Sequence, residues 1–179
     1  MAMRAAWAAS GALLLASAGA GSASFDCARA ANAAERLICV DPVLPALDEE
    51  LAQHYATLQA AGRSARLRND QRAWLATRND CRDAPCVAAQ IERRLAVLAC
   101  DDAHPAQGSA IGTAACAQAE LRVLDRALGS SAGLAAWRQT RSADCRRQGT
   151  AQGGAPGWQA AHALRCEVEA ARRRLDAAR

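Results

Sequence analysis

The 179-residue sequence contains no lysine, so all 22 of its lysine-or-arginine positions are arginine. Residues 26 to 99 carry ten acidic and ten basic side chains, and residues 100 to 179 carry eight acidic and eleven basic ones. A nucleic-acid surface gathers cations on one face and stacks bases on aromatic rings. Here the excess is mild and interspersed, and only one Tyr and one Phe are present. The composition therefore predicts no nucleic-acid partner.

Patterns for catalysis and metal binding are also missing. The sequence has no Ser-His-Asp elbow and no phosphate loop, and its histidines stand apart at His54, His104 and His162. No two cysteines form a C-x-x-C pair, which disfavours a zinc site and a thioredoxin-like redox centre. We therefore expect no catalytic residue, no cofactor and no metal, and we predict that the protein is not an enzyme.

Only the beginning of the chain is apolar enough to engage a membrane. Arg4 supplies a positive charge, and an apolar run from Ala8 to Ala18 leads into small residues that suit signal peptidase. The run is too short to span a bilayer in the mature protein. We predict a signal peptide over residues 1–23, a mature chain that starts near Gly21 or Ser24, and a periplasmic or secreted protein with no membrane span.

The predicted export affects how the cysteines are interpreted. An even number of cysteines in an oxidising compartment is typical of a disulfide framework. Spacing alone does not fix the connectivity: four local pairs are one possibility, and an inter-helix bond such as Cys39–Cys81 is the rival. The eight residues are Cys27, Cys39, Cys81, Cys86, Cys100, Cys116, Cys145 and Cys166.

Helix-forming residues dominate the rest of the chain. Alanine and leucine are abundant, β-branched residues are few, and no stretch alternates with a period of two. Caps and turns predict helices over about 31–39, 45–61, 65–82 and 83–98. The sequence thus predicts an all-α fold.

An internal repeat divides the chain into two unequal parts. Three sets of residues recur in the same order and with the same spacing within each set: Cys39, Leu47, Asp48 and Leu51 with Cys116, Leu124, Asp125 and Leu128; Trp74, Thr77 and Arg78 with Trp137, Thr140 and Arg141; Cys86 and Leu95 with Cys166 and Leu175. The second part lacks about fourteen residues of the hairpin and has a Gly/Pro-rich insert at 148–157. We predict two tandem, disulfide-stapled modules, each a helical hairpin with flanking helices, over 24–100 and 116–179, joined by a linker over 101–115.

The repeated tryptophan and arginine have two interpretations. Trp74 and Arg78 share a helical face with Leu67, and a buried arginine needs an acidic partner. The favoured interpretation is structural, with ion pairs Asp48–Arg78 and Asp125–Arg141 bridging neighbouring helices. The alternative places Trp74 and Arg78 at a partner surface, where such residues are enriched.

One dense acidic cluster, Asp48-Glu49-Glu50, has two interpretations as well. Carboxylates in the first turn of a helix interact favourably with its dipole. The alternative is a contact surface for a cationic partner.

The first half resembles a known family, the lysozyme inhibitor LprI-like N-terminal family. The resemblance covers about residues 25–98, with a degenerate second copy over about 100–179 in which Leu134 stands where Gln71 would be. Its motifs are Phe25-Asp26-Cys27-Ala28, Glu35, Ile38-Cys39, Asp41-Pro42, Leu44, Leu47-Asp48, Leu51, Tyr55, Gln71-Arg72-Ala73-Trp74-Leu75, Arg78 and Cys81.

The resemblance implies a small helical protein of the cell envelope. It also implies inhibition of lysozyme, or of another cell-wall hydrolase, by occlusion of the sugar-binding cleft, with the first module as the working copy. The alternative function is a structural or interaction module of the envelope that does not inhibit lysozyme.

Overall fold

The computed structural model describes residues 23–62 and 64–178, and this part of the chain is helical with no strand. The all-α prediction is therefore confirmed. The predicted signal peptide lies outside the described residues except for Ala23. The elements are a short 3-10 helix η1 (Cys27–Arg29) and the helices α1 (Ala33–Val40), α2 (Leu44–Ala60), α3 (Ser64–Asn79), α4 (Ala84–Ala99), α5 (Ala110–Leu128), α6 (Ala132–Ala151) and α7 (Pro156–Asp176).

Local signals set the helix ends of the first half. Asn32 caps α1 by accepting a hydrogen bond from the Glu35 amide at 2.9 Å, and Asp83 caps α4 by accepting from the Cys86 amide at 2.8 Å. The third helix was expected to reach residue 82 but ends at Asn79. The chain reverses there because Cys81 is bonded to Cys86 in the first turn of α4.

The first half encloses a dense aliphatic core between α1, α2 and α4, with α3 packed alongside. Burial of such side chains is the main favourable contribution to folding. The largest fully buried side chains are Ile38, Leu44, Leu58, Val87, Ile91, Leu95 and Leu98.

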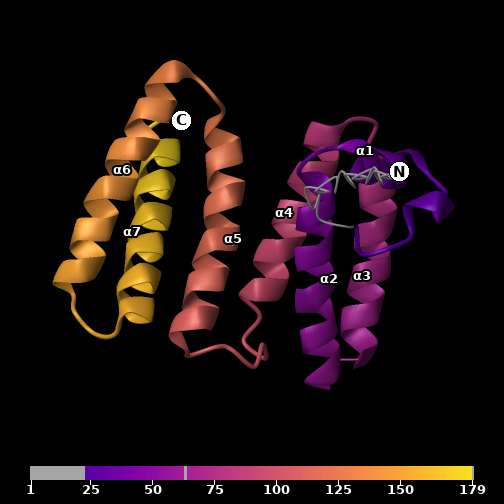
Figure 1. Ribbon diagram of the computed structural model, residues 1–179, viewed down its shortest axis with the longest axis horizontal. Coiled ribbons are helices and arrows are strands. Elements are labelled where there is room, and N and C mark those ends of the chain that lie inside the picture. The colour runs from indigo at the N-terminus through magenta and orange to yellow at the C-terminus, as the bar shows by residue number, and fades with distance from the viewer. Residues whose placement is uncertain (1–22, 63, 179) are drawn as a thin grey trace, which may run out of the picture.

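The second half is a row of three long helices, α5, α7 and α6, in which α7 packs on both neighbours (Figure 1). Its core is small, with Ala117, Leu121, Val168 and Ala171 at the centre. Where α6 and α7 approach most closely, a Cβ atom added to Gly149 would lie 2.3 Å from the Gln159 carbonyl oxygen. The backbones therefore come too close for any residue except glycine at this position.

The two halves pack together through α4 and α5, which lie side by side in Figure 1. Ala119 of α5 is part of the first core, and Arg126 of α5 binds Glu92 of α4 through two hydrogen bonds of 2.5 and 2.7 Å. The linker predicted over 101–115 is shorter, because α5 starts at Ala110 after the cap Ser109. Gly112 was interpreted as part of the linker, but it lies in the first turn of α5, where a Cβ would meet the Ala106 carbonyl oxygen at 2.0 Å.

Four disulfides join the local pairs. Cys27–Cys39 ties η1 to α1, and Cys81–Cys86 closes the turn between α3 and α4. Cys100–Cys116 spans the connection between the halves, and Cys145–Cys166 links α6 to α7. The rival bond Cys39–Cys81 is thus not formed. Among the helices that the structure describes, none combines the length and the apolar character required to cross a membrane.

Candidate functional site

A groove of about 400 Å³ runs between α2 and α3 in the first half. Its size lies within the range of ligand and partner pockets in proteins. Eight of its lining residues belong to the motifs that carry the family resemblance. The lining residues are Ser24, Asp48, Leu51, Ala52, Tyr55, Arg68, Gln71, Arg72, Trp74, Leu75 and Arg78.

Buried charges lie at one end of this groove. Arg78 Nη1 lies 3.7 Å from Asp48 Oδ1, and Arg78 Nη2 lies 3.6 Å from Glu35 Oε1 on α1. Arg78 also donates to the side-chain oxygen of Asn79 from Nε at 3.1 Å and from Nη2 at 2.8 Å. The Asp48 and Arg78 side chains are only 4% and 6% exposed. The structure therefore brings Asp48 and Arg78 together at ion-pair distance, as expected, and Arg78 also contacts Glu35.

The walls of the groove are largely apolar and aromatic. Trp74 donates from its indole Nε1 to the Gln90 carbonyl at 3.1 Å, and this hydrogen bond fixes the ring against α4. The Arg78 guanidinium lies 5.5 Å from the ring centroid, within cation–π range. At the rim, Arg72 is exposed and donates to Asn69 at 2.5 Å. Such a surface offers apolar area for contact and guanidinium groups around it.

The second half contains a related cluster on α5, α6 and α7. Arg141 donates to both oxygens of Asp125, at 2.6 and 2.8 Å, and to Glu167 at 3.0 Å. Trp137 lies between two guanidinium groups, 4.8 Å from Arg141 and 4.6 Å from Arg174. The expected Asp125–Arg141 pair is thus close and bidentate, a strong form of charge-assisted hydrogen bonding.

The two buried arginines differ in their electrostatics. Burial lowers the pKa of Arg78 from its ordinary value, and Asp48 and Glu35 oppose this effect without overcoming it. Hydrogen bonding to Asp125 instead raises the pKa of Arg141 in spite of its burial. The physical cause is distance, because the hydrogen bonds of Arg141 are about 1 Å shorter than the Arg78 contacts and stabilise the charged form more strongly.

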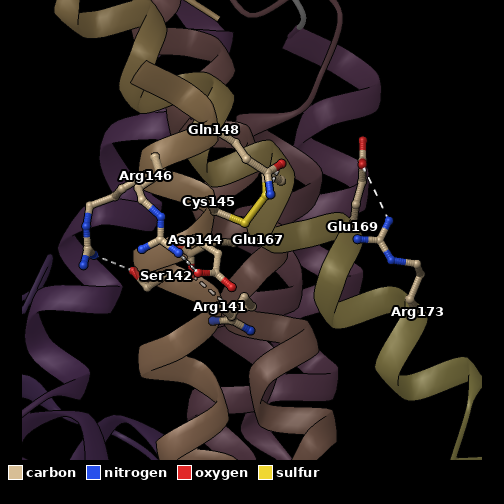
Figure 2. Close-up of a disulfide and its surroundings, with 11 residues drawn as sticks. Arg141, Ser142, Asp144, Cys145, Arg146, Gln148, Glu167, Glu169 and Arg173 are labelled. Carbon is tan, nitrogen blue, oxygen red and sulfur yellow. Dashed lines mark hydrogen bonds and ion pairs between the residues drawn. A yellow bond between two sulfur atoms is a disulfide. The ribbon is translucent and has the colours of Figure 1, made fainter. Parts of the chain in front are cut away.

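Figure 2 shows the surroundings of the disulfide at Cys145, with Gln148 beside the sulfur bridge and Arg141 one helical turn before Cys145; Glu167 directly follows Cys166 of the bridge. The predicted insert at 148–157 is partly helical, because α6 continues to Ala151 and α7 begins at Pro156. Glu169 and Arg173 form an exposed pair along α7 that points away from the bridge. The bridge thus supports the Arg141 cluster by holding α6 against α7.

The acidic cluster does not act as one surface. Asp48 faces the groove and accepts from Ser24, whereas Glu50 binds Arg122 of α5 through hydrogen bonds of 2.6 and 2.7 Å. Glu49 accepts from Gln53 at 3.1 Å. The first-turn interpretation is wrong, because α2 begins at Leu44 and its first turn holds no carboxylate. The three residues point to different neighbours.

Several polar contacts were not expected from the sequence. Glu35 contacts Arg78, and Glu167 contacts Arg141. Of the two, only Glu35 could have been noticed in the sequence, because it stands three residues after the helix cap Asn32. The ring nitrogen Nδ1 of His54, on α2, lies 3.2 Å from the ring nitrogen Nε2 of His104. In the described part of the chain, no three His, Cys, Asp or Glu side chains come together in a group that could hold a metal ion.

Comparison with protein families gives a match in the first half of the chain. Residues 27–98, which include all the lining residues of the groove except Ser24, match the family model described as lysozyme inhibitor LprI. No curated protein and no solved structure matches the chain. Over residues 27–98 the chain is therefore similar to the lysozyme inhibitor LprI family, and the match covers less than half of the chain.

Proposed function

We propose that the protein is exported and that its LprI-family domain binds lysozyme or a related muramidase and inhibits it by covering the sugar-binding cleft. The observation that carries this proposal is the groove between α2 and α3, because the family's motif residues converge on it. The four disulfides fit the same proposal, because such bonds persist in oxidising compartments.

Binding of this kind depends on apolar contact more than on charge. The chain has a formal net charge of +4, and a cationic lysozyme would be repelled at long range rather than attracted. Leu51, Tyr55, Trp74 and Leu75 supply the groove with the aromatic and aliphatic surface that such a complex needs. Inhibition should therefore weaken little when the salt concentration is raised from 0.05 to roughly 0.3 M, where surface charges are screened.

The first experiment is lysis of peptidoglycan by lysozyme, titrated with the purified and oxidised mature protein. Loss of activity that saturates near one protein per enzyme supports the proposal. An unchanged rate at high molar excess, against several lysozyme classes, contradicts it and favours the envelope-module alternative.

Variants of α3 test whether the groove is the binding surface. Arg72→Ala and Leu75→Ala alter residues that line the groove, and we expect each to weaken inhibition by about tenfold, as loss of a hot-spot residue does. Arg66→Ala is the matched control, because Arg66 is on the same helix, 90% exposed, and outside the groove. Equal inhibition by all three variants would place the binding surface elsewhere.

A further inference from the structure

Ser24 makes two hydrogen bonds to one buried carboxylate. Its backbone N–H donates to Asp48 Oδ2 at 3.0 Å, and its hydroxyl donates to the same oxygen at 2.6 Å. The other oxygen of Asp48 faces Arg78. The nitrogen of Ser24 therefore occupies a position on Asp48 where a cation would be favourable.

The cluster around Asp48 has room for a second positive charge. Two carboxylates, Asp48 and Glu35, share the guanidinium of Arg78 at 3.7 and 3.6 Å. In the described part of the chain, Arg78 is the cation that contacts these two carboxylates, so the three groups together carry one net negative charge. Buried charge is costly unless it is paired, and a further cation at Ser24 would bring the cluster to neutrality.

The second half shows how such a cluster is balanced. Asp125 and Glu167 face two guanidinium groups, those of Arg141 and Arg138, and Arg138 Nε lies 3.3 Å from Asp125 Oδ1. Arg138 follows Trp137 directly, whereas the residue that follows Trp74 is Leu75. The first cluster lacks this second arginine, and the nitrogen of Ser24 lies on its aspartate instead.

We propose that signal peptidase hydrolyses the Ala23–Ser24 bond and that the new α-ammonium group of Ser24 forms an ion pair with Asp48. This inference rests on the export included in the proposed function. Water splits the peptide bond, so that Ala23 leaves as a carboxylate and the Ser24 nitrogen takes up the protons and becomes an ammonium ion. Gly21-Ser22-Ala23 provides the small residues that the peptidase requires on the leaving side. Processing thus exchanges a neutral donor for a charged one beside a buried carboxylate.

The first test is the amino-terminal sequence and intact mass of the full chain after expression in an exporting bacterium. A mature protein that starts at Ser24 supports the inference. A start at Gly21, after the competing Ala18-Gly19-Ala20 site, overturns it but leaves export intact. An unprocessed chain overturns the inference and contradicts export as well. Lysozyme inhibition is measured separately, so the two failures are distinguishable.

The absence of lysine makes the ion pair directly measurable. In the mature protein, the α-amino group is the sole primary amine that an acylating reagent can label. An ammonium ion held by a carboxylate has a raised pKa, so labelling at pH 8 should be several-fold slower in the wild-type protein than in Asp48→Asn. Asp26→Asn is the control, because Asp26 is exposed, lies near the same terminus and caps η1 by accepting a hydrogen bond from the Ala28 amide. Equal labelling rates in all three proteins would overturn the ion pair.

A second variant keeps the test informative if Asp48→Asn does not fold. Adding one alanine before Ser24 moves the ammonium group away from Asp48 and leaves every other side chain in place. We expect faster labelling and a lower melting temperature than in the protein that starts at Ser24. Unchanged values for both measurements would overturn the inference.

Discussion

The two halves of the molecule both place a tryptophan, an arginine and two carboxylates together, but they differ in what surrounds these groups. In the first half, Arg78 makes contacts of 3.6 to 3.7 Å with its carboxylates beside a dense aliphatic core. In the second half, Arg141 makes hydrogen bonds of 2.6 to 3.0 Å and the core is small. The comparison teaches that stability can depend mainly on apolar burial in one half and more on charged hydrogen bonds in the other.

The largest expected effect comes from the first core. Leu95→Ala should lower the free energy of unfolding by about 4 kcal/mol, because Leu95 is fully buried and its removal leaves a cavity among large neighbours. Denaturant unfolding of the oxidised protein measures this loss. The matched variant is Leu121→Ala in the second core, for which we expect about 2 kcal/mol, because this core has few fully enclosed side chains and can relax around the cavity. Equal losses would contradict the proposed difference between the cores.

The next largest loss of stability is expected from the arginine clusters. Here the second half should lose more stability than the first. Arg141→Ala should cost about 3 kcal/mol, because it leaves Asp125 and Glu167 without their closest cation. Arg78→Ala should cost about half as much, because its contacts are longer. Thermal unfolding of both variants checks the order. An Arg78→Ala protein with an unchanged melting temperature would count against any structural role for the Asp48–Arg78 pair.

A glycine pair on α6 tests how closely the second half is packed. Gly149→Ala should destabilise the protein by about 2 kcal/mol, because its Cβ would overlap with α7. Gly133→Ala lies on the same helix with open space around it and should stabilise the protein by about 0.5 kcal/mol through helix propensity. The two melting temperatures should shift in opposite directions. A shift of the same sign and size in both would mean that α6 and α7 are not held at this separation.

The smallest effect concerns the connection between the halves. The Ala106 amide donates to His104 Nδ1 at 3.2 Å, so His104 Nε2 carries the proton and donates to His54 Nδ1. Burial, together with His104, lowers the pKa of His54 below its ordinary value near 6.5. A lowered folded-state pKa means that the neutral form is favoured by folding. The associated stability is present above pH 6.5 and is lost as the pH falls through the folded-state pKa.

Unfolding measured between pH 7.5 and 5 should therefore show a loss of stability that His54→Gln reduces. His162→Gln is the control, because His162 lies on α7 and stacks on Trp158, away from this connection. A pH dependence identical in the wild-type protein and in His54→Gln would contradict the role of His54.

Signals that act over a few residues were sufficient to predict the helices. Helices α1 and α4, capped by Asn32 and Asp83, begin within about two residues of the predicted starts at 31 and 83, because each cap satisfies backbone groups within its own turn. The end of α3 and the start of α5 were displaced. The end of α3 lies where the Cys81–Cys86 disulfide reverses the chain, which no local pattern indicates. The start of α5 does have a local signal, its cap Ser109.

The candidate site was predicted only in part. The pairs Asp48–Arg78 and Asp125–Arg141 followed from their recurrence, and the structure places both within ion-pair distance. The groove itself and the separation of Glu49 and Glu50 from Asp48 depend on how α2 is rotated against α3 and α4, a rotation that directs Glu50 to Arg122 of α5. Rotation of a helix against two neighbours is set by the packing of all three, so the acidic run alone could not reveal it.

The sequence by itself determined the helical content, the disulfide framework as a class and the similarity of the first half to the LprI family. These properties follow from composition, cysteine number and motif spacing, which are local or countable. Only the tertiary structure decided that the two halves pack through α4 and α5, that Glu35 and Glu167 complete the arginine clusters, and that Ser24 lies on Asp48. Those contacts join residues far apart in the chain, and their geometry depends on packing that no short stretch of sequence specifies.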